Sequence, residues 1–219
     1  MSKSILTIDG LDGSGKSTFT RRLIEALAAG GQPCVAIRVD DFRRPVDWAG
    51  VANEQEAYYD AYYDLAACEA CLAAFAAGAP GAEVPIYDIA TERRTGTRSL
   101  VFEGVDVAVL EGVFPLRMPT AAAGTVIVLE TTEAEARRRI IRRDLAKGRT
   151  ETEITHRIEH RYFPSQARYR AEFRPRDRAE IVIDNERPTE PRGIERDLGR
   201  LPPRLQEILA QFLPVPDER

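Results

Sequence analysis

The sequence of 219 residues has few cysteines, few histidines and no long apolar run. Three irregularly spaced cysteines cannot form a disulfide framework. Cys68 and Cys71 form a C-x-x-C in an alanine-rich stretch, but no second cysteine pair exists to complete a zinc site. We therefore expect both to pack as small buried hydrophobes. No apolar stretch approaches the roughly 20 residues of a membrane-spanning helix, which excludes a membrane partner.

Charge and composition narrow the class further. The formal net charge of −4 gives no general attraction to nucleic acid, so no nucleic-acid partner is expected. An apolar content of 43% with 30% charged residues is typical of a globular domain. The first expected strand begins at Ser4 and leaves no room for a signal peptide, so we expect a cytoplasmic location.

Short apolar runs alternate with helical patterns along the chain, which predicts a doubly wound, mostly parallel five-stranded sheet covered on both faces, an α/β fold in three layers. The expected strands are Ser4–Ile8, Pro33–Val39, Val105–Leu110, Thr125–Leu129 and Glu180–Ile183. Long helices are expected at Lys16–Ala29 and Glu54–Ala77. A Thr132/Glu135 capping box starts another helix, which runs to about Ala146.

Three further segments stand apart from the expected sheet. Residues 81–103 have the pattern of a small β-hairpin excursion. Residues 137–151 form an arginine-bearing helical lid that ends in Lys147-Gly148-Arg149. We expect a domain over residues 1–187 and a tail over 188–219, rich in proline and charge, that lies on the surface with an amphipathic segment near Arg204–Phe212.

Residues 10–17 read G-L-D-G-S-G-K-S, a complete G-x-x-x-x-G-K-[ST] loop between a β-branched run and a helix. The backbone N–H groups of such a P-loop wrap nucleotide phosphates. The lysine reaches the β/γ-phosphates and the hydroxyl binds Mg²⁺. The sequence therefore predicts a P-loop NTPase that uses ATP and Mg²⁺, although chance matches to the pattern occur. The expected ATP-binding residues are Gly10, Asp12, Gly13, Ser14, Gly15, Lys16, Ser17 and Thr18.

Acidic residues follow two of the expected strands. Asp40 and Asp41 come after the second run, where ligands gather in a doubly wound sheet, and such an acid can accept a hydroxyl proton. Either could instead cap a turn. Glu111 ends the third run and could complete a metal site with Ser17, and a plain surface carboxylate is the alternative.

Basic residues and two histidines lie in the second half of the chain. Among the lid arginines, Arg143 and Arg149 are the best placed to clamp phosphates, and others are expected to be solvated or paired with acids. His156 and His160 lack a third ligand nearby, so they are weak candidates for a metal site.

Five motifs in order carry a family resemblance: V-D-D-F-R-R-P at 39–45, V-P-I-Y-D at 84–88, V-L-E-G-V-F at 109–114, R-R-D-x-x-x-G-R at 142–149 and A-E-I-V-I-D-N at 179–185. The opening T-I-D-G-L-D-G-S-G-K-S-T is equally similar to thymidylate kinases, but no D-R-[YFH]-x-x-S element follows. The series resembles the uridine kinase-like branch of the phosphoribulokinase and nucleoside kinase family over residues 4–186.

The resemblance implies a role for each matching residue. Asp40 would be the general base and also lie at the metal, with Lys16, Arg143 and Arg149 as the other catalytic residues and Ser17 and Glu111 as metal ligands. The residues it implies at the acceptor are Asp40, Phe42, Glu56, Tyr59 and Tyr87. Glu92 and Arg93, which follow Tyr87 in the hairpin, are expected at the acceptor from their own chemistry. The family also suggests a homo-oligomer.

One position departs from the family pattern. Uridine-cytidine kinases carry a histidine five residues after the tyrosine that matches Tyr87, and here Glu92 stands in its place. A carboxylate cannot donate to a pyrimidine carbonyl as an imidazole N–H can. Arg93 and Arg94 could then bind an anionic acceptor such as a sugar phosphate or an acid, and the alternative is that they are solvated loop arginines.

Three functions remain open from the sequence. The leading one is an ATP- and Mg²⁺-dependent kinase that phosphorylates the primary hydroxyl of a nucleoside or similar small molecule. The second keeps this chemistry with pantothenate, glycerate, nicotinamide riboside, a sugar phosphate or an antibiotic-like nucleoside as acceptor. The third is a nucleotide sensor without phosphotransfer, which would not need a base at an acceptor.

Overall fold

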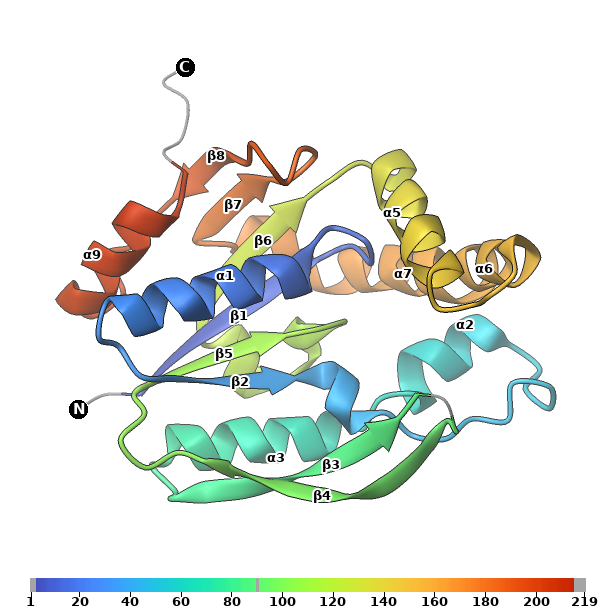
Figure 1. The fold of residues 1–219 in the computed structure, drawn as a ribbon, viewed down its shortest axis with the longest axis horizontal. Helices are drawn as coiled ribbons and strands as arrows, with labels where there is room; N and C mark the ends of the chain where they lie inside the picture. The colour runs from blue at the N-terminus through green and yellow to red at the C-terminus, as the bar shows by residue number, and fades with distance from the viewer. Residues whose placement is uncertain (1–2, 90, 215–219) are drawn as a thin grey trace.

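A computed structural model describes residues 3–89 and 91–214, and it confirms the α/β fold with a mostly parallel sheet (Figure 1). The main sheet has six strands in the order β2-β5-β1-β6-β7-β8. Strands β2, β5, β1, β6 and β7 are parallel, and β8 is antiparallel to β7. Their bounds are β1 Ser4–Gly10, β2 Cys34–Arg38, β5 Val107–Glu111, β6 Thr125–Glu130, β7 Ile181–Asp184 and β8 Arg192–Arg196.

The expected count of five strands was one too low, because the segment after residue 188 contributes β8 to the sheet. This strand reads R-G-I-E-R and its burial alternates, with Gly193 buried and Arg192 exposed. A strand that pairs on one edge and keeps one face in water needs no continuous apolar run. The sequence pattern used for the central strands therefore missed it.

Helices α1 (Lys16–Ala29) and α9 (Pro203–Phe212) cover one face of the sheet (Figure 1). Leu23 and Leu27 of α1 are fully buried against Leu205 and Leu209 of α9 and against side chains of the central strands. The segment expected to lie on the surface is thus partly core: the apolar side of α9 is buried, and its polar side faces water.

The second core lies on the other face, where α3 (Leu65–Ala76) and α7 (Phe163–Phe173) pack. Short helices α4 (Pro119–Ala122) and α8 (Pro175–Arg178) follow β5 and α7. Cys68 and Cys71 are buried in this core as free thiols, as expected.

The helix predicted over residues 54–77 is divided. Helix α2 (Glu54–Glu56) continues as a π-helical turn over Ala57–Ala61, and α3 begins separately. Asp64 caps α3 by accepting from the Ala67 N–H at 3.2 Å, and its own N–H donates to the Phe42 carbonyl at 2.8 Å. The cap therefore starts α3 as a new helix, separate from the π-helical turn at Ala57–Ala61.

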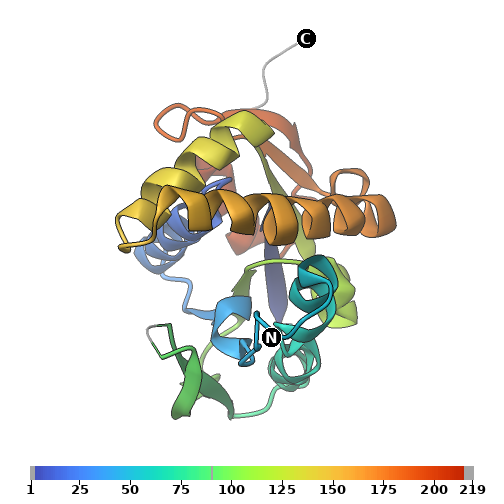
Figure 2. The ribbon, with the colours of Figure 1, turned by 90° about the vertical axis from the view of Figure 1, so that its right-hand side faces the viewer.

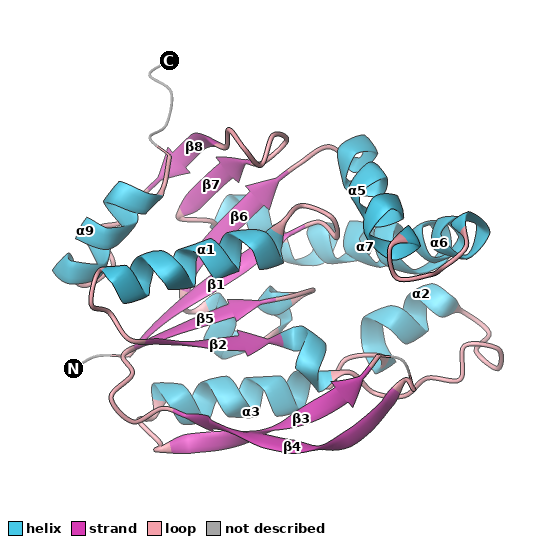
Figure 3. Ribbon diagram, in the orientation of Figure 1, coloured by secondary structure: helices cyan, strands magenta, loops and turns pink. Residues whose placement is uncertain are grey.

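The predicted excursion is an antiparallel hairpin of β3 (Gly81–Asp88) and β4 (Arg93–Val101), which forms a sheet of its own below the main sheet (Figure 3). Strand β4 is exposed along its whole length except at Leu100. The hairpin therefore stands as an arm beside the loop that follows β2.

Opposite the hairpin lie α5 (Glu133–Leu145) and α6 (Glu151–Arg157). Helix α6 continues through a π-helical segment, Ile158–Tyr162, into α7, and Figure 2 shows the three end to end as one rod. Ile140, Ile154 and Ile158 form a small core that joins α5 to α6. Among residues 3–89 and 91–214, no helix combines the length and apolar character of a bilayer span.

Candidate active site

The P-loop connects β1 to α1, as predicted, and its glycines are required by geometry. Gly13 and Gly15 have φ values of 83° and 97°, which L side chains rarely adopt. A Cβ on Gly13 would lie 2.5 Å from the Ala136 carbonyl oxygen, and one on Gly15 would lie 2.7 Å from Asn185 Nδ2. The loop can follow this path only with glycine at both positions.

Lys16 is buried at the start of α1, with 7% of its surface exposed. Its Nζ donates to the carbonyls of Gly10 at 2.7 Å and Leu11 at 2.9 Å. An ammonium has three N–H donors, so these two bonds leave one for a phosphate oxygen. The lysine is thus held across the loop with its charge at the phosphate position.

Ser17 and Glu111 form an oxygen pair that suits Mg²⁺. Ser17 Oγ donates to Glu111 Oε2 at 2.9 Å. Burial first, and then the charge of Asp40, raises the pKa of Glu111, against the hydrogen bond from Ser17. Within the described ranges no three His, Cys, Asp or Glu side chains cluster as a complete metal site. Mg²⁺ is commonly held by one or two protein oxygens and fills its shell with phosphate and water oxygens, and Ser17 and Glu111 offer two such oxygens.

A cavity of about 450 Å³ opens in front of the P-loop. Its lining includes Lys16, Ser17 and Glu111, the apolar side chains of Phe19, Pro188 and Pro191, and the polar side chains of Arg139 and Asn185. The predicted Asp12, Gly13, Gly15, Lys16, Ser17 and Thr18 line it, while Ser14 is buried and Gly10 faces the opposite side of the loop.

A smaller cavity of about 110 Å³ lies between the lid and the hairpin. Asp40, Asp12 and Arg143 line both cavities, so the two spaces adjoin at these three side chains. The complete lining of the smaller cavity is Asp12, Asp40, Arg43, Tyr58, Tyr62, Tyr63, Tyr87, Ile89, Glu92, Arg143, Lys147, Arg149, Arg157 and Tyr162.

Asp40 lies in the 3₁₀ turn Val39–Phe42 after β2 and forms an ion pair with Arg43 at 2.5 Å. Burial opposes the charge of Arg43, but Asp40 and the neighbouring tyrosines raise its pKa. The guanidinium lies over the ring of Tyr87, 5.9 Å from its centroid. Arg43 Nε is buried and finds no acceptor among the described residues.

Three lid cations converge on one buried carboxylate, that of Asp144. Arg143 Nε lies 2.7 Å from Oδ1, Arg149 Nη1 lies 3.2 Å from Oδ2, and Lys147 lies 3.8 Å from Oδ1. The side chain of Asp144 has no exposed surface. The structure thus brings together the predicted Arg143 and Arg149 and adds Lys147, which the sequence analysis did not select.

Four predicted acceptor residues lie outside the small cavity. Phe42 is in the core, 1% exposed, and Glu56 points to solvent from α2. Tyr59 is buried on the far side of its π-helical turn, where its hydroxyl donates to Glu172 at 2.6 Å. Arg93 is exposed on β4. The turn at Ala57–Ala61 changes the helical phase, so Tyr58 and Tyr62 face the cavity instead.

The two arginines and two histidines left open by the sequence have structural neighbours. Arg94 donates to the Arg43 carbonyl at 2.9 Å and to Asp64 at 3.2 Å, so it fastens the hairpin to the loop after β2. His156 lies 3.0 Å from Glu54, and its ring centroid is 4.5 Å from that of His160. These contacts join α2 to α6.

Several cavity residues were not found by sequence reasoning. Tyr58, Tyr62 and Tyr63 come from the Y-Y-D-A-Y-Y run, and Arg43 follows Asp40 by three residues in the same turn. The sequence does show these two signals, as a cluster of tyrosines and as an acid and a base three residues apart. Arg157 and Tyr162 belong to elements whose approach to the cavity has no local sequence signal.

A sequence model of the phosphoribulokinase/uridine kinase family matches residues 5–187. The chain belongs to this family. A uridine kinase from Deinococcus deserti is 30% identical over 151 residues, which span 67% of this chain and 71% of that protein. Family membership makes the chain a P-loop kinase, a phosphotransferase with an alcohol group as acceptor that uses ATP with a divalent metal.

Two solved structures share the fold. One, described as a possible uridine kinase from Bacillus stearothermophilus, has a TM-score of 0.64 at 22% identity, over 83% of this chain and 89% of that one. The other, described as a putative fructose transport system kinase from Silicibacter sp. TM1040, has a TM-score of 0.65 at 21% identity, over 78% and 85%. The two proteins are described with different substrates, so the shared fold does not identify the acceptor.

Proposed function

We propose that this family kinase transfers the γ-phosphate of ATP to the primary hydroxyl of a small acceptor, and that the acceptor is a nucleoside such as uridine or cytidine or a molecule of similar size. One observation carries the proposal: Asp40 lines the P-loop cavity and the tyrosine-lined cavity at once. A base at that junction reaches a hydroxyl in one cavity beside the phosphate end of the other.

The proposed step needs four contributions from the chain. Asp40 accepts the hydroxyl proton as the acceptor oxygen bonds to the γ-phosphorus and the bond to the β-phosphate oxygen breaks, which releases ADP. Lys16 neutralises phosphate charge. Mg²⁺, held by Ser17 and Glu111, would supply further positive charge at the phosphates. Arg43 pairs with the Asp40 carboxylate and holds it in place.

The lid would complete the site. Arg143 lines both cavities, and Arg149 lines the small one. Asp144 holds both arginines at the mouth of the site before a phosphate arrives. We propose that they turn to the transferring phosphoryl group as the lid closes, because a trianionic phosphate attracts them more strongly than one carboxylate.

The second candidate keeps this chemistry and changes the acceptor. Glu92 lines the small cavity in a left-handed conformation with φ of 52°, where uridine-cytidine kinases have a histidine. A carboxylate there accepts hydrogen bonds, which favours an acceptor that offers hydroxyl or amine donors at this point. Pantothenate, glycerate, nicotinamide riboside, sugar phosphates and antibiotic-like nucleosides remain in the test.

The test is ADP formation with Mg²⁺ across these compounds, uridine and cytidine, with Asp40→Asn beside the wild type. We expect one acceptor class to stimulate turnover, and Asp40→Asn to lower it about 10²-fold or more while it still binds ATP. Asp41→Asn is the matched control, because Asp41 pairs with Arg98 at 2.6 Å and lines neither cavity. Turnover in Asp40→Asn equal to wild type would refute the base, and no stimulation by any acceptor would favour a sensor.

A further inference from the structure

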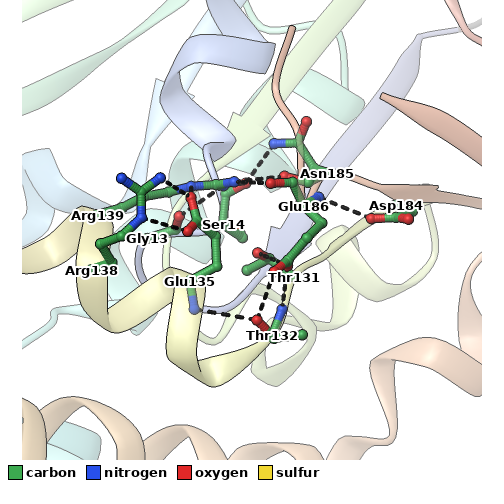
Figure 4. A network of polar contacts seen from close by, with 10 residues as sticks. All are labelled: Gly13, Ser14, Thr131, Thr132, Glu135, Arg138, Arg139, Asp184, Asn185 and Glu186. Carbon is green, nitrogen blue, oxygen red and sulfur yellow. Dashed lines mark hydrogen bonds and ion pairs between the residues drawn. The ribbon is translucent and has the colours of Figure 1, made fainter. Parts of the chain in front are cut away.

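A network of polar contacts joins the P-loop to α5 and to the segment that follows β7 (Figure 4). Its centre is the guanidinium of Arg139 on α5, of which 10% is exposed. Nε donates to Glu135 at 2.6 Å, and Nη2 donates to the carbonyls of Asn185 at 2.9 Å and Glu186 at 2.8 Å. Arg139 therefore ties α5 to the segment that follows β7.

The same guanidinium also reaches the P-loop. Nη1 lies 3.3 Å from the Gly13 carbonyl oxygen and 3.4 Å from that of Ser14. Asn185 Nδ2 donates to the same Ser14 carbonyl at 2.6 Å. Asn185 is 5% exposed, and its backbone N–H donates to the Glu130 carbonyl at 2.8 Å, so its position is fixed by the sheet.

These contacts fix the direction of a peptide N–H. The Ser14 carbonyl and the Gly15 N–H belong to one planar trans peptide unit and point in opposite directions. Asn185 and Arg139 hold the carbonyl toward α5 and the segment that follows β7. The Gly15 N–H then points the other way, into the loop, where a P-loop offers its N–H groups to phosphate.

We propose that Arg139 and Asn185 are positioning residues that hold the P-loop in its phosphate-binding conformation through the carbonyls of Gly13 and Ser14. The inference rests on the proposed nucleotide site. It adds that binding of the polyphosphate, rather than of the nucleoside, depends on these contacts of Arg139 and Asn185 with the P-loop, which we call the clamp. A lysine at position 139 keeps the positive charge, but its single ammonium group lacks the spread N–H donors of a guanidinium. It therefore cannot donate at once to α5, to the P-loop and to the segment after β7.

The test is the binding of Mg-ADP and of Mg-tripolyphosphate, which has phosphates and no nucleoside, by titration calorimetry. We expect Arg139→Lys and Asn185→Ala each to weaken binding of both ligands by about tenfold, by comparable factors. Arg138→Lys is the matched control, because Arg138 is 65% exposed on the same helix and bonds the same Glu135 without reaching the loop. It should stay within about twofold of wild type.

The possible outcomes separate cleanly. Unchanged affinity in both variants, or a loss confined to Mg-ADP, overturns the clamp, and the latter would instead make Arg139 a nucleoside contact. An equal loss of affinity in the Arg138→Lys control would assign the effect to the ion pair with Glu135, and this result would also overturn the clamp. Should Arg139→Lys fail to fold, Asn185→Ala carries the test alone, since it removes one donor and no charge.

Failure of the proposed function would look different. Both ligands bind without any acceptor, so a wild type that binds Mg-ADP but shows no acceptor-stimulated turnover refutes phosphotransfer while the clamp result still counts. A wild type that binds neither ligand overturns the nucleotide site and the clamp together.

Discussion

Asp40 and Glu111 follow β2 and β5, two strands that lie side by side, and the pairing of Arg38 with Glu111 sets these ends level. This arrangement could be predicted from the sequence, because an acid after a buried parallel strand must emerge at the same edge of the sheet as the P-loop. Arg139 and Asn185 could not be, since they act on backbone carbonyls that only the folded chain brings near.

Glu111 gives a pH prediction at the scale of one residue. Its pKa is raised, so it gains a proton at a higher pH than an ordinary glutamate near 4.3. Mg²⁺ needs the carboxylate, so we expect activity to fall as pH falls through that raised pKa. Because Mg²⁺ competes with the proton, more Mg²⁺ should move this acid limb to lower pH.

Initial rates against pH at two Mg²⁺ concentrations measure the effect. Glu111→Gln, whose side chain does not titrate, should need more Mg²⁺ for activity. In this variant the acid limb of the pH profile should no longer shift when Mg²⁺ is raised. An acid limb in the wild type that stays in place when Mg²⁺ is raised would contradict the role of Glu111 at the metal.

At the scale of elements, the first helix was predicted with its bounds, Lys16–Ala29, because a P-loop and a glycine pair mark its two ends. The helix predicted over 54–77 is interrupted instead. Its apolar pattern continues through the break, and the interruption depends on Asp64 meeting Phe42 of a distant loop. Local periodicity carries no information on such a contact.

Asp64, which marks the start of α3, should therefore contribute to the free energy of unfolding. It caps α3 and pairs with Arg44 and Arg94, at 2.8 and 3.2 Å. Burial opposes its charge, but the hydrogen bonds from Arg44, Ala67 and Arg94 outweigh burial and lower its pKa. We expect Asp64→Ala to lower the free energy of unfolding by about 1–2 kcal/mol at pH 7.

Urea denaturation measures this change. A lowered carboxyl pKa stabilises the fold above the unfolded value, near 3.9, and this gain disappears as pH falls through the folded pKa, so the two proteins should converge in acid. Asp60→Ala is the control, since the exposed Asp60 pairs with the half-buried Arg117 and Arg168 but caps no helix. A larger loss in Asp60→Ala would refute the cap argument.

At the scale of the molecule, the chain after residue 188 completes the fold rather than trailing from it. Leu209 of α9 is fully buried against α1, and Phe212 lies 5.4 Å from Phe19 between ring centroids. Proline and charge in this segment suggested a surface tail. Leu205 and Leu209 instead pack with Leu23 and Leu27 of α1 and with side chains of the central strands.

Leu209→Ala should lower the free energy of unfolding by about 2–5 kcal/mol, because a buried leucine leaves a cavity when it is truncated. Gln211→Ala, exposed on the same helix, should change it by less than about 0.5 kcal/mol. The folded Leu209→Ala protein should bind Mg-ADP like wild type, since α9 lines neither cavity. Weakened binding in a fully folded sample would contradict this independence.

The hairpin of β3 and β4 leaves a strand edge that could associate with the edge of another protein molecule. Within the described residues β4 pairs with β3 alone, so its outer edge offers a row of backbone groups to any other strand. Arg93, Arg94 and Arg98 are exposed along that strand, and Arg94 and Arg98 also pair with Asp64 and Asp41. Charged side chains along an exposed edge hinder its pairing with a second strand. The arginines that fasten the hairpin to the loop after β2 therefore also protect its edge from association with the edge of another molecule.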